Sequence, residues 1–163
     1  MVNVRIRGLY IDVTVDDDLL QKGWYAGQWV TISGNRTVSR ANAANRAGFL
    51  LNGYKLRDVY MRPFYFNDGS TFIPNEHENS AITSNRKTPM ICDSGDFDFN
   101  PNVYDTTQIY NYNDYLYVNN NGVLTNVPTG FASVGHVLSK PEDNNGWLGF
   151  LMQINWWFKM CDV

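Results

Sequence analysis

The sequence is poor in cysteine, histidine and charge. Its 163 residues include two cysteines, two histidines and 18% charged residues, against roughly 25% charged residues in an average domain. A structural zinc site needs about four closely spaced Cys or His ligands, whereas His77 and His136 lie 59 positions apart. Cys92 and Cys161 are expected to be free thiols in a reducing cytosol, because a chain of this size can bury an adequate core without a disulfide. The sequence therefore predicts no metal and no cofactor.

Long hydrophobic runs and an excess of basic residues are also missing. The longest apolar runs, such as 48–51 and 147–152, fall far short of the ~20 residues that span a bilayer, so no membrane partner is expected. Nucleic-acid binders depend on Lys and Arg at phosphates, and here 13 basic residues face 16 acidic ones. Nucleic acid is therefore not an expected partner either.

The charge is unevenly distributed along the chain. Nine basic and five acidic residues give +4 over residues 1–62, and four against eleven give −7 over 63–163. Two explanations of this uneven charge stay open. In one, oppositely charged faces of neighbouring subunits contact each other; in the other, the fold brings residues of both halves together on one surface.

Aromatic residues and alternating patterns are abundant. Ten Tyr, nine Phe and five Trp carry too much apolar area for a disordered chain. The segments 17–22 and 40–46 offer at most one helical turn each. Alternation of apolar and polar residues predicts strands over 4–15, 29–32, 37–39, 48–51, 59–66, 70–73, 88–92, 108–112, 115–118, 122–125, 133–138 and 147–158. This pattern predicts one all-β domain over 1–163, a β-barrel or β-sandwich of about ten short strands.

One pattern of a hairpin followed by a glycine-initiated strand occurs twice. In residues 27–51, Val30 precedes Gly48 by 18 positions, and in residues 113–138, Leu116 precedes Gly135 by 19. A glycine at the start of a strand is typical of two backbones in close approach. Either the chain contains a structural repeat, or two ordinary hairpins look alike.

The second pattern resembles a known class of viral protein. Tyr115-Leu116-Tyr117-Val118, the turn at Gly122, a short strand and Val134-Gly135-His136-Val137, closed by 140–150, resemble the small β-rich capsid decoration proteins of tailed bacteriophages, also called head-stabilising or cement proteins. The first pattern, 27–51, resembles them loosely. The resemblance implies a structural virion protein on the capsid exterior, made in the host cytoplasm, without enzyme activity. It also implies the major capsid protein as partner, and further copies of this chain, as a trimer or as neighbours.

Two segments are candidates for the contact with such a shell. Adjacent strand residues point to opposite faces, so one of Trp156 and Trp157 must point away from the core, and interfaces are enriched in Trp. The polar, aperiodic segment 75–87 is predicted to project as a loop or arm, because aperiodic loops of this length are uncommon without a function. The candidate interface residues are Trp156, Trp157, Phe158, Glu76, His77, Glu78, Arg86 and Lys87.

Two other functions stay open. A carbohydrate-binding β-sandwich, such as a tail or fibre adhesin module, would stack exposed Trp and Tyr on sugar rings and bind hydroxyls through Asn and Asp. A glycan-cleaving enzyme would use Asp96, Asp98 or Asp105, but 93–98 is more typical of a solvated acidic loop. The sequence contains no nucleophile elbow and no phosphate-binding loop, the motifs that indicate nucleophilic catalysis and phosphate binding.

Two smaller expectations concern the tyrosines and the first acidic run. The alternation of Tyr110 with Tyr112, and of Tyr115 with Tyr117, is expected to turn these rings toward the core. The acidic run 16–18 is expected to be a solvated turn or the start of a helix, not a metal cluster.

Overall fold

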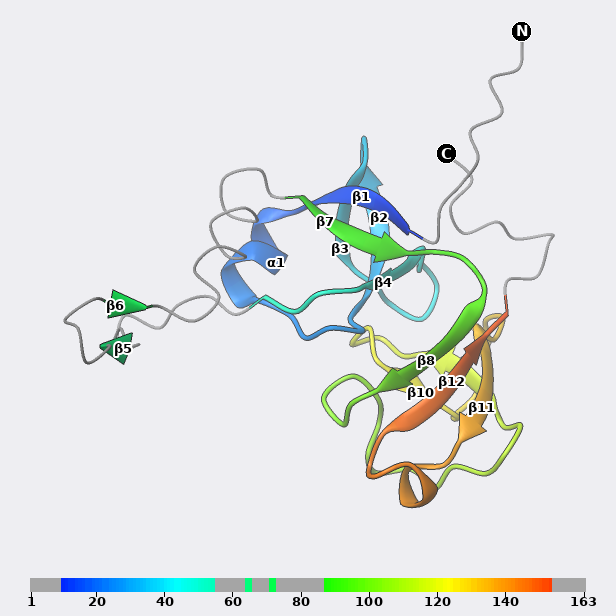
Figure 1. The fold of residues 1–163 in the computed structure, drawn as a ribbon. Coiled ribbons are helices and arrows are strands. Elements are labelled where there is room, and N and C mark those ends of the chain that lie inside the picture. Colours follow the sequence, from blue (N-terminus) through cyan, green and yellow to red (C-terminus); the bar gives the residue numbers. More distant parts are fainter. Residues whose placement is uncertain (1–9, 55–63, 66–70, 73–86, 154–163) are drawn as a thin grey trace, which may run out of the picture.

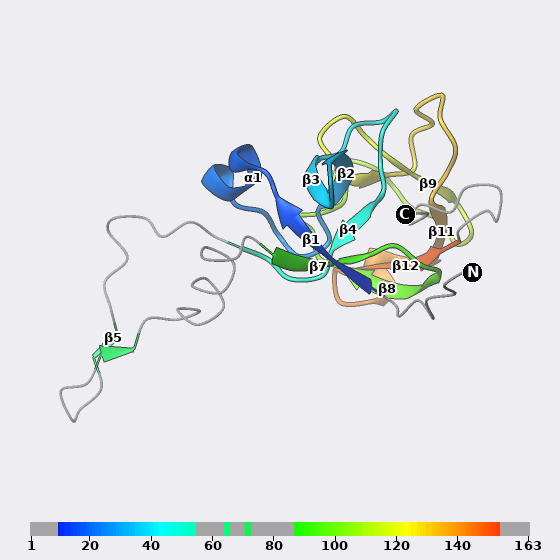
Figure 2. The ribbon, with the colours of Figure 1, turned by 90° about the horizontal axis from the view of Figure 1, so that it is seen from above.

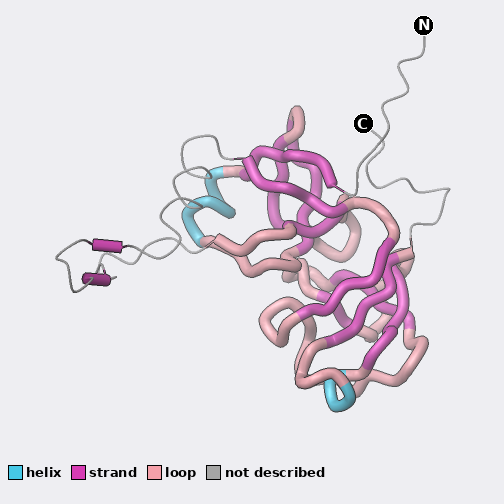
Figure 3. Tube along the Cα trace, in the orientation of Figure 1, coloured by secondary structure: helices cyan, strands magenta, loops and turns pink. Residues whose placement is uncertain are grey.

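The computed structural model describes residues 10–54, 64–65, 71–72 and 87–153. Short strands dominate it (Figure 3), which confirms the predicted all-β fold class. The elements in chain order are β1 (Tyr10–Val15), α1 (Asp17–Lys22), β2 (Trp29–Gly34), β3 (Thr37–Arg40), β4 (Gly48–Leu50), β5 (Phe64–Tyr65), β6 (Thr71–Phe72), β7 (Lys87–Ile91), β8 (Gly95–Phe99), β9 (Tyr115–Val118), β10 (Leu124–Thr125), β11 (Gly135–Ser139), the 3-10 helix η1 (Pro141–Asp143) and β12 (Leu148–Met152).

Ten of the strands form two units of five, and β5 pairs with β6. The first unit is a closed barrel in the order β1-β3-β2-β4-β7, in which β1 and β3 are parallel and the other pairs antiparallel. The second unit is a sheet in the order β10-β9-β11-β12-β8. Figures 1 and 2 show the two units side by side, with the chain passing from β7 directly into β8.

The second unit repeats the strand arrangement of the first. In each unit a central strand, β2 or β9, lies between its hairpin partner, β3 or β10, and a third strand, β4 or β11. The third strand then pairs with β7 or β12, which pairs with β1 or β8. A parallel bridge from Tyr104 to Leu124 corresponds to the parallel pair of Val15 with Val38.

The residue registers of the two units also agree. Val30 pairs with Gly48, and Leu116 pairs with Gly135. Because these are the residues whose spacing suggested a repeat, the strand pairing confirms the repeat.

The two units share a hydrophobic core. On β2 and β4, Val30 and Leu50 point into the barrel, while the adjacent Trp29 and Phe49 belong to the core cluster of the second unit, as period-two alternation requires. The Phe49 ring lies 4.9 Å, centroid to centroid, from both Phe97 and Phe99. The second unit therefore packs against the outer face of the barrel.

Polar contacts reinforce this junction. The Gln28 amide nitrogen donates to the carbonyl oxygens of Trp29 at 2.9 Å and of Gly122 at 3.0 Å. The Trp29 backbone N–H donates to the same Gly122 carbonyl at 3.1 Å. Arg46 Nη2 donates to the Ala132 carbonyl at 2.6 Å, and burial lowers the pKa of Arg46. The turn between β9 and β10, which contains Gly122, and the loop between β10 and β11, which contains Ala132, are therefore both held against the first unit.

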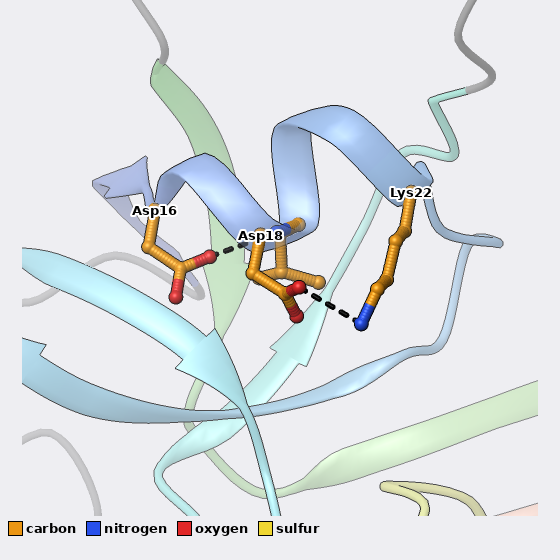
Figure 4. Close-up of polar contacts among 4 residues, drawn as sticks. Asp16, Asp18 and Lys22 are labelled. Atoms are coloured by element: carbon orange, nitrogen blue, oxygen red, sulfur yellow. Dashed lines mark hydrogen bonds and ion pairs between the residues drawn. The ribbon is translucent and has the colours of Figure 1, made fainter.

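The acidic run 16–18 begins a helix, as expected. Asp16 is the N-cap of α1, where its side chain accepts a hydrogen bond from the Leu19 N–H at 2.9 Å, and Lys22 Nζ lies 2.8 Å from Asp18 Oδ1 (Figure 4). Carboxylates near a helix N-terminus stabilise the helix, because they accept from its free N–H groups and interact favourably with the helix dipole. No helix in the described part of the chain is long and apolar enough to cross a membrane.

Several expectations about individual segments are wrong. Residues 108–112 form no strand, and 93–98, predicted as a loop, contains most of β8. Lys87, placed in the projecting loop, is instead the first residue of β7 and pairs with Thr14. Cys92 is disulfide-bonded and not a free thiol. The chain has one other cysteine, Cys161, which lies outside the described residues.

Candidate interaction face

The outer face of the second unit carries a row of four aligned residues, which we call the open row: Tyr115, His136, Leu151 and Asp96. Each pairs with the next across neighbouring strands, Tyr115 with His136, His136 with Leu151, and Leu151 with Asp96. Their sequence neighbours Leu116, Val137, Phe150 and Phe97 belong to or pack against the core. The row therefore points away from the core on β9, β11, β12 and β8.

The first unit has an equivalent row, which we call the covered row: Trp29, Phe49 and Ile91. These residues pair in the same order across β2, β4 and β7 and are at most 4% exposed. By register, Trp29 corresponds to Tyr115, Phe49 to His136 and Ile91 to Leu151. The second unit buries the covered row, whereas Tyr115 is 58% exposed and the rest of the open row is half-buried or exposed.

Two rings form the aromatic end of the open row. The Tyr115 and His136 ring centroids lie 4.7 Å apart, so both side chains stand on the same face. His136 Nδ1 lies 3.3 Å from the Asn113 carbonyl oxygen, which accepts if this nitrogen is protonated. The two rings are tilted by 43° to each other, and together they form an aromatic surface on this face.

Carboxylates lie at the other end of the open row. Asp96 and Asp98 are both exposed on β8, on the face opposite Phe97 and Phe99. The Asn144 amide donates to Asp98 Oδ1 at 2.9 Å. Within the described residues, neither aspartate has a cationic partner. Asp96 and Asp98 thus share one face of a strand, and the expectation of an acidic loop over 93–98 is wrong for both.

The loops beside this face add another ring and another carboxylate. The Tyr112 hydroxyl donates to Asp143 Oδ2, and this hydrogen bond is the main cause of the raised pKa of Tyr112. Lys140 Nζ lies 5.2 Å from the centre of the Tyr112 ring, a cation–π distance. Tyr112 is 57% exposed, so the expectation that Tyr112 and Tyr115 face the core is wrong.

The second unit is strongly acidic. Over residues 92–153 the sequence has a single basic residue, Lys140, against seven acidic ones, Asp93, Asp96, Asp98, Asp105, Asp114, Glu142 and Asp143. This unit therefore carries a negative field that favours cationic groups on an approaching partner.

Asp105 is separated from the two strand aspartates in the topology. It follows Tyr104 beside β10, at the opposite end of the strand order from β8. Its carboxylate accepts from the Thr107 hydroxyl at 2.6 Å and from the Thr107 N–H at 3.0 Å. The hydroxyl bond is the main cause of its lowered pKa, which favours a carboxylate that stays ionised and not a general acid. In the described residues, no group of three or more His, Cys, Asp or Glu is placed to hold a metal ion.

Most of the interface predicted from sequence lies outside the described residues. This applies to Trp156, Trp157, Phe158, Glu76, His77, Glu78 and Arg86. Lys87 is described, and its side chain is exposed at the start of β7. Sequence reasoning missed the open row, although the spacings from Val30 to Gly48 and from Leu116 to Gly135 would have aligned Tyr115 with Trp29.

Comparisons of the chain with models of protein families, with curated proteins and with solved structures find no match.

Proposed function

We propose that this chain is a structural virion protein that binds the outer surface of a bacteriophage capsid and stabilises it by adhesion. Its partner is the major capsid protein, and neighbouring copies of the chain occupy adjacent sites. In this role the protein has no catalytic centre and needs no cofactor. Binding buries apolar side chains between a rigid β unit and the shell subunits beneath it.

The observation that supports this proposal is the relation between the covered row and the open row. The two units have the same strand arrangement. The face that is buried against protein in the first unit is exposed in the second. A face that already functions as a protein interface in the first unit is suited to protein contact in the second. The resemblance of the second unit to capsid decoration proteins points in the same direction.

The test is to count this chain in purified particles of the source virus by quantitative mass spectrometry, relative to the major shell protein. A fixed stoichiometry comparable to that of the shell subunit supports decoration of the capsid. A handful of copies per particle contradicts it and assigns the chain to the tail or a fibre. Absence from the particle contradicts any role in the virion.

A second candidate, carbohydrate binding, is favoured by the exposed ring of Tyr115, which shares one sheet face with Asp96 and Asp98, and by the exposed ring of Tyr112 beside Asp143. Aromatic rings next to carboxylates and amides are suited to stacking on sugars and binding their hydroxyls. A glycan array separates the two candidates. Saturable binding to one sugar family that Tyr115→Ala abolishes would favour the second candidate over the first.

A further inference from the structure

We propose that the open row docks a basic and apolar protein segment of the shell, with apolar side chains over Tyr115, His136 and Leu151 and a lysine or arginine at Asp96 and Asp98. This inference rests on the proposed function, and it deepens that function by assigning the docking face and the chemistry of its partner.

The covered row shows what kind of group fits this face. Phe49, which corresponds to His136, contacts Phe97 and Phe99 edge-on, and Trp29, which corresponds to Tyr115, lies 6.1 Å from the Phe150 ring. The partner of the first unit's face is therefore a cluster of rings. The open row keeps two rings and an aliphatic side chain at the equivalent positions, so it fits a partner that presents apolar side chains.

The acidic end distinguishes the open row from the covered row. Tyr10 stands in the first unit where Asp96 stands in the second, because Tyr10 pairs with Ile91 as Asp96 pairs with Leu151. Within the described residues, Asp96 has no cationic partner, and Lys140, the single basic residue over 92–153, lies over Tyr112. Charge complementarity across an interface therefore requires a cation from the partner.

The repeat supplies a matched control for this charge. Asp12 of β1 pairs with Pro89, and Asp98 of β8 pairs with Gly149, so Asp12 occupies the position in the first unit that corresponds to Asp98. Both side chains are exposed on a strand. Asp12→Asn removes the same charge as Asp98→Asn from the same type of site but away from the open row.

The experiment measures binding of the full chain to purified shells from virus particles that lack it, at low and at high ionic strength. We expect Asp96→Asn, Asp98→Asn and Tyr115→Ala each to weaken binding about tenfold, and Asp12→Asn, the matched control for Asp98→Asn, to leave it unchanged. Added salt should weaken binding of the wild-type chain more than that of Asp96→Asn, because salt screens the charge pair. Unchanged melting temperatures for all variants would show that the losses concern binding and not folding.

The other outcomes separate the two proposals. Shell binding that is equal for all variants would overturn the docking face and leave the proposed function intact. Failure of the wild-type chain to bind shells would overturn the proposed function and this inference with it. Binding to a glycan that is lost in Tyr115→Ala would replace the basic segment by a sugar as the occupant of the open row.

Discussion

Gly48 and Gly135 hold the same position in the two units, and each faces the backbone of the neighbouring strand. A Cβ built on Gly48 would lie 2.2 Å from the Ile91 carbonyl oxygen, and one on Gly135 would lie 2.0 Å from the Leu151 carbonyl oxygen. Real Cβ atoms do not approach backbone oxygens so closely. The pairing of β4 with β7 and of β11 with β12 therefore depends on glycine at these two positions.

Gly48→Ala and Gly135→Ala are each expected to lower the free energy of unfolding by about 3 kcal/mol or more, because backbone cannot move aside as a flexible side chain can. Gly34→Ala is the control, since its Cβ would lie 3.6 Å from Thr37 Cβ, an ordinary contact. It should cost less than about 1 kcal/mol. Urea unfolding of the three variants measures the difference, and equal losses would show that the close approach is relieved by strand movement.

Gln28→Glu tests the polar contact between the units. Gln28 is 5% exposed, and its amide nitrogen donates to the carbonyls of Trp29 and Gly122. A carboxylate there would face these oxygens without a hydrogen to donate, so the free energy of unfolding should fall by about 2–4 kcal/mol at pH 7. Gln28→Met should cost only about 1 kcal/mol, because each of the two carbonyl oxygens still accepts a backbone hydrogen bond. The Ala41 N–H donates to the Trp29 carbonyl, and the Trp29 N–H donates to the Gly122 carbonyl.

The two variants should also differ in their pH dependence. Burial against carbonyl oxygens favours the protonated form of the introduced carboxyl group, so its folded-state pKa should rise above the usual glutamate value of about 4.3. The stability of Gln28→Glu relative to wild type should therefore recover as pH falls, whereas that of Gln28→Met should stay constant. Thermal melts at several pH values measure this, and parallel curves for both variants would contradict a charge effect.

Tyr110 gives a prediction at alkaline pH. Burial is the main cause that raises its pKa, with a further contribution from the charge of Asp105, and its hydroxyl donates to the Asp105 carbonyl at 2.7 Å. The neutral folded form is thus stabilising below the unfolded-state pKa of about 10, and this contribution is lost as pH rises above it. Tyr110→Phe should reduce the alkaline loss of stability and cost about 1 kcal/mol at pH 7.

Melting temperatures between neutral and alkaline pH test this prediction. Tyr115→Phe is the control, because its ring is exposed, and it should follow the wild-type curve. Wild-type and Tyr110→Phe curves that fall in parallel would show that Tyr110 is not responsible for the alkaline loss.

The sequence predicts most strands where apolar residues alternate, although 108–112 alternates and forms no strand. It predicts less well where carboxylates alternate with apolar residues. In β8, Asp96 and Asp98 alternate with Phe97 and Phe99, a period-two pattern hidden by the low strand propensity of Asp and by the turn-like Ser94 before it. Burial is harder still to predict. Whether the outer face of a sheet is covered depends on the packing of distant strands, and periodicity within one strand contains no such information.

Trp29 and Tyr115 test whether the packing of distant strands decides burial, because they hold equivalent positions in the two units and one is buried while the other is exposed. Trp29 is fully buried between the units, so Trp29→Ala should lower the free energy of unfolding by about 3–5 kcal/mol. Tyr115→Ala should lower it by less than about 1 kcal/mol, since little more than the ring contact with His136 is lost. Urea unfolding of both variants measures the two costs. A cost for Tyr115→Ala close to that of Trp29→Ala would show that the open row is covered within the folded chain itself, and would remove it as a docking face.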